Sequence, residues 1–339
     1  MNIREYSKIA ILQTAFIGDV ILTIPLVDTI RRNNPDCEIT FITTPQAAEI
    51  ADIASSVNNT LVFDKRSKQK SLSGIRSFAR DLNSNNFDLW ISPHRSFRSS
   101  LLSYLIKADY KIGFKNAAFS WLYDYRAKYI PNFHEIERNF ELLNPFEIDN
   151  YSNLNECLFS ISETDKKSAK EITYDLNEYI VLSPGSVWET KKWLPEYFAV
   201  LAEMLKNSGF GVVLSGSNAD YDICDFVSKQ SGARNLSGLT NIPTTLEIVR
   251  NAKLVITNDS APTHFAGFMN TPVITIYGPT SPIFGFSPRA DKSRIIYNDK
   301  LKCSPCRIHG SRKCPIGTHD CMKSIKPDFV FSEFLSFID

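Results

Sequence analysis

Short apolar runs alternate with segments of helical periodicity along the whole of this chain of 339 residues. Such alternation is typical of βαβ units, in which helices cover both faces of a parallel sheet. We therefore expect an α/β fold built of two Rossmann-like halves. The expected strands are residues 8–13, 38–42, 60–63, 87–91, 179–183, 211–215, 254–257 and 273–277. The expected helices are residues 19–32, 71–82, 96–106, 195–206, 219–229, 244–250 and 261–268.

A polar stretch over residues 149–170 separates the two halves, because it is poor in long apolar runs. A chain of this length commonly forms two domains. We expect a first domain over residues 1–158 and a second over residues 159–322, which would face each other across a cleft. Residues 323–339 are expected to form a C-terminal helix that packs back on the body.

Asp19 lies in the most apolar stretch of the chain, residues 9–27. A membrane span is disfavoured there, because an acidic residue at the centre of a spanning helix opposes insertion by roughly 2.5–3.5 kcal/mol. A buried strand, a tight turn at residues 14–18 and a helix that starts at Asp19 fit the pattern better. Asp19 would then lie at the carboxyl end of the first strand, where open α/β sheets bind ligands. From the residues alone, it is either a functional carboxylate or merely the N-cap of that helix.

The net charge of the chain is close to zero, since 38 basic residues face 37 acidic ones. Whole-chain electrostatics therefore give no indication of nucleic-acid binding. Six basic side chains nevertheless gather between Lys65 and Arg80. They form either a solvated loop and helix face or a patch that attracts an anionic substrate or a membrane surface.

Seven cysteines without a recognisable export signal indicate a reducing, cytoplasmic compartment. Four of these cysteines cluster near the end of the chain, with His309 and His319 close to them in sequence. Only the first pair has a spacing common in zinc sites. We therefore expect a loop of free or disulfide-prone thiols and no metal, with zinc as the alternative. The four residues are Cys303, Cys306, Cys314 and Cys321.

A loop at residues 183–195 follows an expected strand and combines a glycine, hydroxyl groups and two lysines. Lys191 and Lys192, together with backbone amides, could hold a diphosphate or could simply lie in solvent. Two tryptophans in the same loop favour packing over disorder.

Two more loops place acidic residues after expected strands. Asp220 follows a glycine turn, and its carboxylate suits ribose hydroxyls or, equally, the dipole of the next helix. In the loop at residues 257–264, Asp259 and His264 flank backbone amides suited to a phosphate. His264 could also be an ordinary helix-face histidine.

Several motifs in sequence order make the chain similar to the ADP-heptose–lipopolysaccharide heptosyltransferases of glycosyltransferase family 9. The resemblance covers nearly the whole chain. The cysteine cluster resembles a tail found in members similar to the second heptosyltransferase. The motifs are Gly18-Asp19-Val20 with Pro25, Pro93 to Ser99 with Lys111 to Phe114, Pro184-Gly185-Ser186, Thr190-Lys191-Lys192-Trp193, Asn258 to His264, and Tyr277-Gly278-Pro279-Thr280.

The resemblance implies a GT-B-type fold, with the nucleotide sugar in the carboxyl-terminal domain, and an inverting, metal-independent transfer of a heptose. Asp19 would be the general base that deprotonates the acceptor hydroxyl. Lys191 would neutralise the diphosphate and Asp220 would accept hydrogen bonds from the ribose. The full set of implied donor-binding residues is Ser186, Thr190, Lys191, Asp220, Asp259, Ser260, Ala261 and His264.

The implied acceptor is the Kdo–lipid A or heptosyl-Kdo inner core of lipopolysaccharide, at the inner face of the cytoplasmic membrane. Arg95, Arg98 and Lys111 suit its carboxylates and phosphates, with Lys115 nearby in sequence. They could also be surface cations without a role. Whether the acceptor sugar is Kdo or a heptose already attached to it stays open, although the cysteine tail favours the second.

Ala261 departs from the family pattern, because many relatives have a glycine there that lets the backbone approach the phosphate. Two other functions are compatible with the sequence. One is a nucleotide-sugar epimerase or hydrolase on the same fold, which would consume donor without an acceptor. The other is a non-catalytic module that binds a sugar nucleotide or a lipid.

Overall fold

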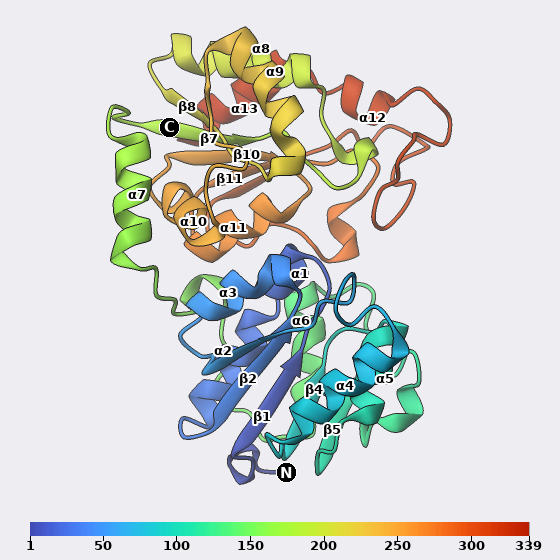
Figure 1. The fold of residues 1–339 in the computed structure, drawn as a ribbon. Helices are drawn as coiled ribbons and strands as arrows, with labels where there is room; N and C mark the ends of the chain where they lie inside the picture. The colour runs from blue at the N-terminus through green and yellow to red at the C-terminus, as the bar shows by residue number, and fades with distance from the viewer. Residues whose placement is uncertain (339) are drawn as a thin grey trace. The chain divides into compact units, whose positions relative to one another are not determined.

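The computed structural model describes residues 1–338 and divides the chain into two compact units, Met1–Ser160 (unit 1) and Ile161–Asp339 (unit 2). Each unit contains one six-stranded sheet whose faces are covered by helices (Figure 1). The expected α/β fold with two Rossmann-like halves is confirmed. The division between the units lies within the polar stretch of residues 149–170.

The sheet of unit 1 is entirely parallel and has the strand order β3-β2-β1-β4-β5-β6. Successive strands are added on one side of β1 and then, from β4 onward, on its other side. This reversal is the topological switch point of a doubly wound sheet. The strands are β1 Lys8–Leu12, β2 Glu38–Thr43, β3 Asn59–Val62, β4 Leu89–Ser92, β5 Tyr110–Phe114 and β6 Tyr125–Ala127.

The helix expected to start at Asp19 differs from the prediction in two ways. It starts two residues earlier, so that Asp19 is the third residue of α1, and it breaks at Leu22–Thr23 before α2 begins. Pro25 explains the break, because proline has no N–H to donate and its ring clashes with the preceding helical turn. The helices of unit 1 are α1 Ile17–Ile21, α2 Ile24–Asn33, α3 Ala48–Ile53, α4 Leu72–Asn83, α5 Phe97–Leu105 and α6 Glu135–Phe140.

Unit 2 repeats the same topology, with the strand order β12-β11-β10-β7-β8-β9 and parallel pairing throughout. Its switch point lies between β7 and β10. The strands are β7 Tyr179–Ser183, β8 Gly211–Leu214, β9 Arg234–Asn235, β10 Leu254–Asn258, β11 Val273–Ile276 and β12 Ser293–Ile296. The helices are α7 Glu163–Thr173, α8 Pro195–Asn207, α9 Tyr221–Ser231, α10 Ile242–Arg250, α11 Ala261–Met269, α12 Asp320–Lys323 and α13 Pro327–Ile338.

The C-terminal helix α13 packs on unit 2. Phe334 is fully buried, and its ring meets that of Phe210 edge to face at 5.4 Å. The central strands β7 and β10 are buried along their whole length, as expected where helices cover both faces of a parallel sheet. The loop that follows each of these two strands at the switch point of unit 2 therefore starts from a fully buried strand.

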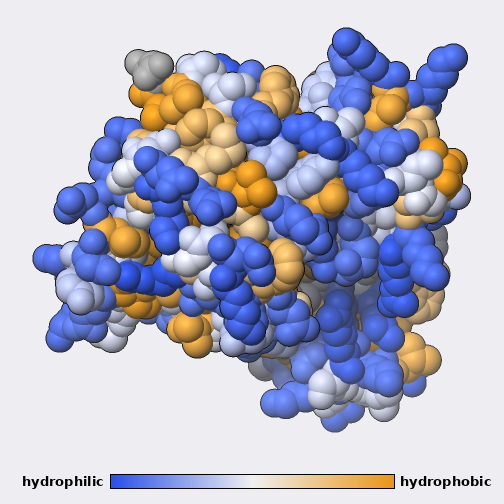
Figure 2. Space-filling model, turned by 90° about the horizontal axis from the view of Figure 1, so that it is seen from above, coloured by the Kyte–Doolittle hydropathy of each residue, from blue (hydrophilic) through white to orange (hydrophobic). Residues whose placement is uncertain are grey.

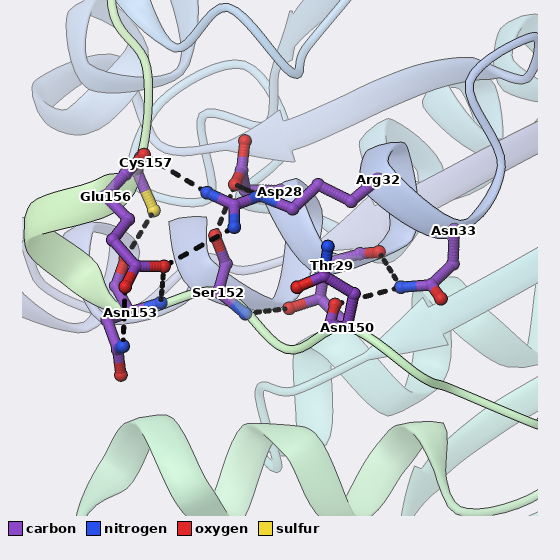
Figure 3. A network of polar contacts seen from close by, with 9 residues as sticks. All are labelled: Asp28, Thr29, Arg32, Asn33, Asn150, Ser152, Asn153, Glu156 and Cys157. Carbon is purple, nitrogen blue, oxygen red and sulfur yellow. Dashed lines mark hydrogen bonds and ion pairs between the residues drawn. The ribbon is translucent and has the colours of Figure 1, made fainter.

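The last segment of unit 1 is fastened to α2 by a polar network (Figure 3). The Arg32 guanidinium contacts the buried Asp28 carboxylate at 2.8 Å and donates to the Glu156 carbonyl oxygen at 3.2 Å. The Ser152 hydroxyl also donates to Asp28, and the Asn33 side chain donates to the Asn150 carbonyl oxygen at 3.0 Å. Residues 150–157 thus belong structurally to unit 1.

Within residues 1–338, none of the helices combines the length and the apolar character needed to cross a membrane. The face of the molecule seen from above in Figure 2 carries mainly hydrophilic side chains, with hydrophobic ones in small groups between them.

Candidate active site

Polar residues gather at the switch point of each sheet. In open α/β sheets, ligands bind outside the carboxyl ends of the strands at this point. In unit 1 these ends belong to β1 and β4, and in unit 2 to β7 and β10. Three of the four loops singled out in the sequence follow β1, β7 and β10, and the Pro93–Ser99 motif follows β4.

A buried cluster of polar side chains joins the two loops of unit 1. The hydroxyl oxygen of Thr14 lies 2.8 Å from Nδ1 of His94, and that nitrogen lies 2.7 Å from the hydroxyl oxygen of Ser99. Burial, together with the positive charges of Lys65 and Arg95, lowers the pKa of His94 to about 3. His94 is therefore neutral at physiological pH and holds the loops together.

Asp19 is half-buried beside this cluster, in the first turn of α1. One of its carboxylate oxygens accepts a hydrogen bond from the Phe16 backbone N–H at 3.2 Å. Burial, and then the negative charge of Glu135, raise the pKa of Asp19 to about 7, against the effect of that hydrogen bond. A carboxylate with a pKa near 7 is suited to accept a proton at physiological pH.

A buried ionic network that we did not anticipate from the sequence lies close to Asp19. Glu135, the first residue of α6, pairs with Arg138 at 2.9 Å, and both are also bonded to the Tyr129 hydroxyl. The Arg95 guanidinium stacks 3.8 Å above the Tyr129 ring. The sequence signal was His134-Glu135-Ile-Glu-Arg138, an acidic helix start that is also common in ordinary surface helices.

The structure places Lys111 apart from the carboxyl ends of β1 and β4, near which Arg95 and Arg98 lie. Arg95 is close enough to Asp19 to oppose the rise of its pKa. Arg98 donates to the Lys65 carbonyl oxygen at 3.0 Å and so holds the basic loop that follows β3. Lys111, by contrast, lies at the second position of β5, about 10 Å from its carboxyl end at the usual rise per residue. Its amine donates to the Ser103 carbonyl oxygen at 3.1 Å, which is a structural contact within unit 1.

In unit 2, an ion pair links the loops that follow β7 and β10. The amine of Lys191 lies 2.6 Å from the Asp259 carboxylate, and both side chains are largely buried. The Thr280 hydroxyl donates to the same carboxylate oxygen at 2.6 Å. Asp259 therefore orients the lysine, while the remaining N–H bonds of the amine stay available to an anion.

Asn258 holds the same two loops together and was not singled out in the sequence as a site residue. Its side-chain oxygen accepts from the Trp193 backbone N–H at 2.9 Å, and its amide nitrogen donates to the Pro184 carbonyl oxygen at 2.8 Å. Because it is fully buried at the end of β10, these bonds fix the course of the lysine-bearing loop.

Thr190 and Ser186 make contacts inside the protein. The Thr190 hydroxyl donates to the Ser311 carbonyl oxygen at 3.0 Å and accepts from the Ser311 N–H at 2.8 Å. Nε2 of His319 lies 2.8 Å from the Thr190 carbonyl oxygen. These bonds fasten the cysteine-bearing loop to the Lys191 loop. The Ser186 hydroxyl is half-buried and accepts from the Trp188 N–H at 3.3 Å.

The start of α11 offers the backbone N–H groups of Ser260 and Ala261 to an anion, whereas Pro262 has no N–H and the Thr263 N–H donates to the Ser260 carbonyl oxygen at 3.0 Å. Ser260 is its N-cap residue, but the Ser260 side chain does not cap the first turn, and Ala261 is the first residue of the helix. His264 lies in the same turn and is buried, which lowers its pKa to about 4. Nδ1 of His264 has no hydrogen-bond partner among the residues that the structure describes. A neutral histidine with a spare ring nitrogen can bind a polar group of a ligand.

The Asp220 side chain packs against Gly185 in the lysine-bearing loop. Its carboxylate accepts from the Ser217 N–H at 2.9 Å and from the Ser217 hydroxyl at 2.7 Å. A Cβ atom at Gly185 would lie 2.2 Å from the other carboxylate oxygen. Glycine at position 185 is therefore required for this close approach.

We expect Gly185→Ala to weaken ADP binding and to destabilise the protein by about 1–3 kcal/mol, because the methyl group must push Asp220 aside. Calorimetry with ADP and thermal unfolding measure the two effects. In the double variant Gly185→Ala/Asp220→Gly, stability should return while ADP affinity stays low. Unchanged ADP affinity in the single variant would mean that the Gly185–Asp220 contact does not shape the nucleotide site.

The four clustered cysteines are free thiols in the structure. Across residues 1–338, no three His, Cys, Asp or Glu side chains are grouped so that they could hold a metal ion. The absence of a metal cofactor stays a prediction, which the experiment proposed below tests.

Comparisons with known proteins agree with this arrangement. The model of glycosyltransferase family 9 (heptosyltransferase) matches residues 75–316. The chain is 27% identical over 295 residues to the lipopolysaccharide core heptosyltransferase OpsX of Haemophilus influenzae, covering 81% of this chain and 80% of the relative.

Two solved structures show the same fold. The structure of a family 9 glycosyl transferase from Veillonella parvula has a TM-score of 0.87 at 21% identity and covers 100% of this chain and 98% of that one. That of the ADP-heptose lipopolysaccharide heptosyltransferase II of Escherichia coli has a TM-score of 0.80 at 20% identity and covers 98% of each chain. Both likenesses extend over the two units.

Proposed function

Because this chain belongs to glycosyltransferase family 9, we propose that it transfers a heptose from ADP-heptose to the inner core of lipopolysaccharide, with Asp19 as the general base. The observation that carries the role of Asp19 is a carboxylate at the switch point of unit 1 whose pKa is raised to about 7. A relative and a solved structure named as heptosyltransferases support the donor and the acceptor.

Donor binding is assigned to unit 2 because its switch point combines a buried cation with the N–H groups of Ser260 and Ala261 at the start of α11. Lys191 and the start of α11 would bind the diphosphate, where negative charge grows as ADP leaves. Asp220 would accept hydrogen bonds from the ribose hydroxyls. Asp259 orients Lys191 through the 2.6 Å ion pair, so that its effect on the sugar nucleotide would be indirect.

Acceptor binding is assigned to unit 1. In the transfer, a carboxylate oxygen of Asp19 takes the proton of the acceptor hydroxyl as that oxygen bonds to the anomeric carbon. The bond from the anomeric carbon to the diphosphate oxygen breaks, and ADP keeps its electron pair. Attack opposite the leaving group inverts the configuration. Arg95, held on the Tyr129 ring, is the cation best placed to contact an anionic group of the acceptor.

The pH dependence of the reaction should follow the ionisation of Asp19. Only the carboxylate can accept a proton, so kcat/KM is expected to rise with pH through about 7 and then level off. Steady-state rates between about pH 5.5 and 8.5 measure this limb. A kcat/KM that does not change with pH would mean that a group other than Asp19 takes the proton of the acceptor hydroxyl. In Asp19→Asn, the residual rate should lack the acidic limb.

A panel of nucleotide sugars, tested against lipopolysaccharides with progressively truncated cores, examines the proposed reaction. We expect mass spectrometry to find one added heptose only when ADP-heptose and an inner-core acceptor are both present. The truncation that still accepts heptose would identify the acceptor as Kdo or heptosyl-Kdo. Repeating the assay in EDTA tests the predicted metal independence.

Two outcomes of this panel would contradict the proposal. Consumption of the donor without any acceptor would indicate an epimerase or a hydrolase. Absence of turnover, with sugar-nucleotide binding retained, would indicate a non-catalytic module. The assay should be run with membranes as well as in solution, because we propose that the enzyme meets its lipid-linked acceptor at the inner face of the cytoplasmic membrane.

A further inference from the structure

Four aromatic side chains form a continuous exposed patch on unit 1, which we call the aromatic patch. Phe97 and Tyr104 come from α5, and Phe119 and Trp121 from the segment between β5 and β6. Adjacent ring centroids lie 5.1 Å apart for Phe97–Phe119, 6.4 Å for Phe119–Trp121 and 5.9 Å for Trp121–Tyr104. Trp121 is 68% exposed, and Phe97 and Tyr104 are each 55% exposed.

The local structure presents these rings outward. Phe97, Leu101 and Tyr104 occupy one face of α5, because residues four and three apart share a face of a helix. Phe119 has a φ of 52°. A bulky residue rarely adopts this left-handed backbone, which costs about 1–2 kcal/mol. Large apolar groups held exposed at a conformational cost indicate an interaction surface.

The chain around the aromatic patch is strongly basic, although the whole protein is nearly neutral. Residues 65–128 contain thirteen Lys and Arg residues, four Asp residues and no Glu. Exposed basic side chains stand close to the patch in sequence, at Lys107 after α5 and at Lys115 before Phe119. The loop that Arg98 holds adds three exposed ones, which are Arg66, Lys68 and Lys70.

We propose that the aromatic patch and its basic surroundings form a docking surface for an anionic lipid bilayer. Tryptophan and tyrosine favour the interface between lipid headgroups and acyl chains, where one end of the ring is apolar and the other wet. Clustered Lys and Arg side chains are attracted to anionic lipids. Charge complementarity thus selects a negatively charged membrane as the occupant.

The surface is connected directly to the candidate acceptor site. The Ala118 backbone N–H donates to the Arg95 carbonyl oxygen at 3.1 Å, so the segment that carries Phe119 and Trp121 is joined to the loop after β4. A headgroup bound near Arg95 would leave its acyl chains in the membrane beside the rings. This step rests on the proposed function, since it takes the acceptor to be lipid-linked.

Flotation with vesicles tests the docking surface. We expect the wild-type protein to bind vesicles that contain phosphatidylglycerol and to be released by salt, but not to bind vesicles of phosphatidylcholine alone. The double variant Tyr104→Ser/Trp121→Ser, which leaves the Pro93–Ser99 motif intact, should bind at least about tenfold more weakly. Tyr174→Ser is the matched control, because Tyr174 is 82% exposed but lies in unit 2. Thermal unfolding of each variant excludes misfolding.

Tryptophan fluorescence tests the contact itself. Brominated phosphatidylglycerol should quench the wild-type protein, and Trp121→Phe should remove most of that quenching, because Trp90 and Trp193 are fully buried and Trp188 is a half-buried residue of unit 2. Equal vesicle binding by the double variant and the wild type would overturn the proposal. So would a dimer, seen by analytical ultracentrifugation, that the double variant abolishes, since the patch would then bind a second copy.

Transfer assays separate this proposal from the proposed function. The double variant should keep the wild-type rate with a deacylated, water-soluble acceptor and lose rate only with an acceptor embedded in vesicles. If the wild-type protein transfers no heptose to either acceptor, the proposed function fails, whereas vesicle binding still decides whether the docking surface exists.

Discussion

Asp19→Asn is expected to lower kcat at least about a hundredfold and to leave ADP affinity near that of the wild type, because a general base contributes roughly 10²–10⁴-fold. Asparagine has nearly the same shape as aspartate, and its side-chain oxygen can still accept the Phe16 N–H that the carboxylate accepts at 3.2 Å. The variant therefore removes the proton acceptor and keeps the helix start. Steady-state kinetics and calorimetry with ADP measure the two quantities.

Thermal unfolding distinguishes a catalytic from a capping role for Asp19. The pKa is raised from 3.8 to about 7 in the folded protein, so the folded state binds more protons than the unfolded state between these values. The free energy of unfolding due to this group therefore decreases as pH rises through about 7. Above that pH, Asp19→Asn should be at least as stable as the wild type. Lower stability with intact turnover would make Asp19 merely a cap.

Lys191→Ala is expected to weaken ADP binding roughly 10- to 100-fold, because a charge-assisted hydrogen bond contributes about 1.5–3 kcal/mol. Lys191→Ala should also weaken ADP binding for a second reason. Asp259 is 6% exposed, and without its partner at 2.6 Å it becomes an unpaired, buried negative charge next to the diphosphate. The stability of the protein should therefore fall together with ADP affinity.

Two further variants separate these effects. Lys192→Ala is the matched control, because Lys192 pairs with the exposed Glu189 at 2.6 Å, and it should change ADP affinity little. In the double variant Lys191→Ala/Asp259→Asn, removal of the unpaired charge should restore part of the stability but not the ADP affinity. If calorimetry gives Lys191→Ala the affinity of the wild type, Lys191 does not bind the diphosphate.

The sequence predicts the central strands of both sheets and the edge strand β3, but it misses β5 and the edge strands β6, β9 and β12. β1, β2, β7 and β10 are covered by helices on both faces, so they appear as apolar runs. By contrast, β9 has two half-buried residues, and β5 carries Lys111 and Gly113 within five residues. A strand at the margin of a sheet needs little hydrophobic burial, so β6, β9 and β12 gave no apolar pattern to detect, and in β5, which pairs on both sides, Lys111 and Gly113 interrupt the apolar run.

The candidate site is predictable only where its residues follow a central strand. Asp19, Lys191 and Asp259 come shortly after apolar strands, so their position in the chain indicates their position in the fold. Glu135 cannot be found this way, because its proximity to Asp19 depends on the packing of α6 against the end of α1. The Asn139 side chain makes that contact through a 3.0 Å hydrogen bond to the Leu22 carbonyl oxygen. A tertiary contact of this kind leaves no local pattern.

The repetition of one strand order in both units has a consequence for how such enzymes diversify. Each unit has its own sheet, its own core and its own switch point. If the acceptor is chosen by unit 1 and the donor by unit 2, selection can alter one choice without disturbing the other. A hybrid could join the first unit of a family member that uses another acceptor to residues 161–339 of this chain. We expect this hybrid to keep the sugar-nucleotide preference of the present protein and to glycosylate the acceptor of the other family member. Substrate range would then evolve by exchange of modules, and the assay described above would detect it.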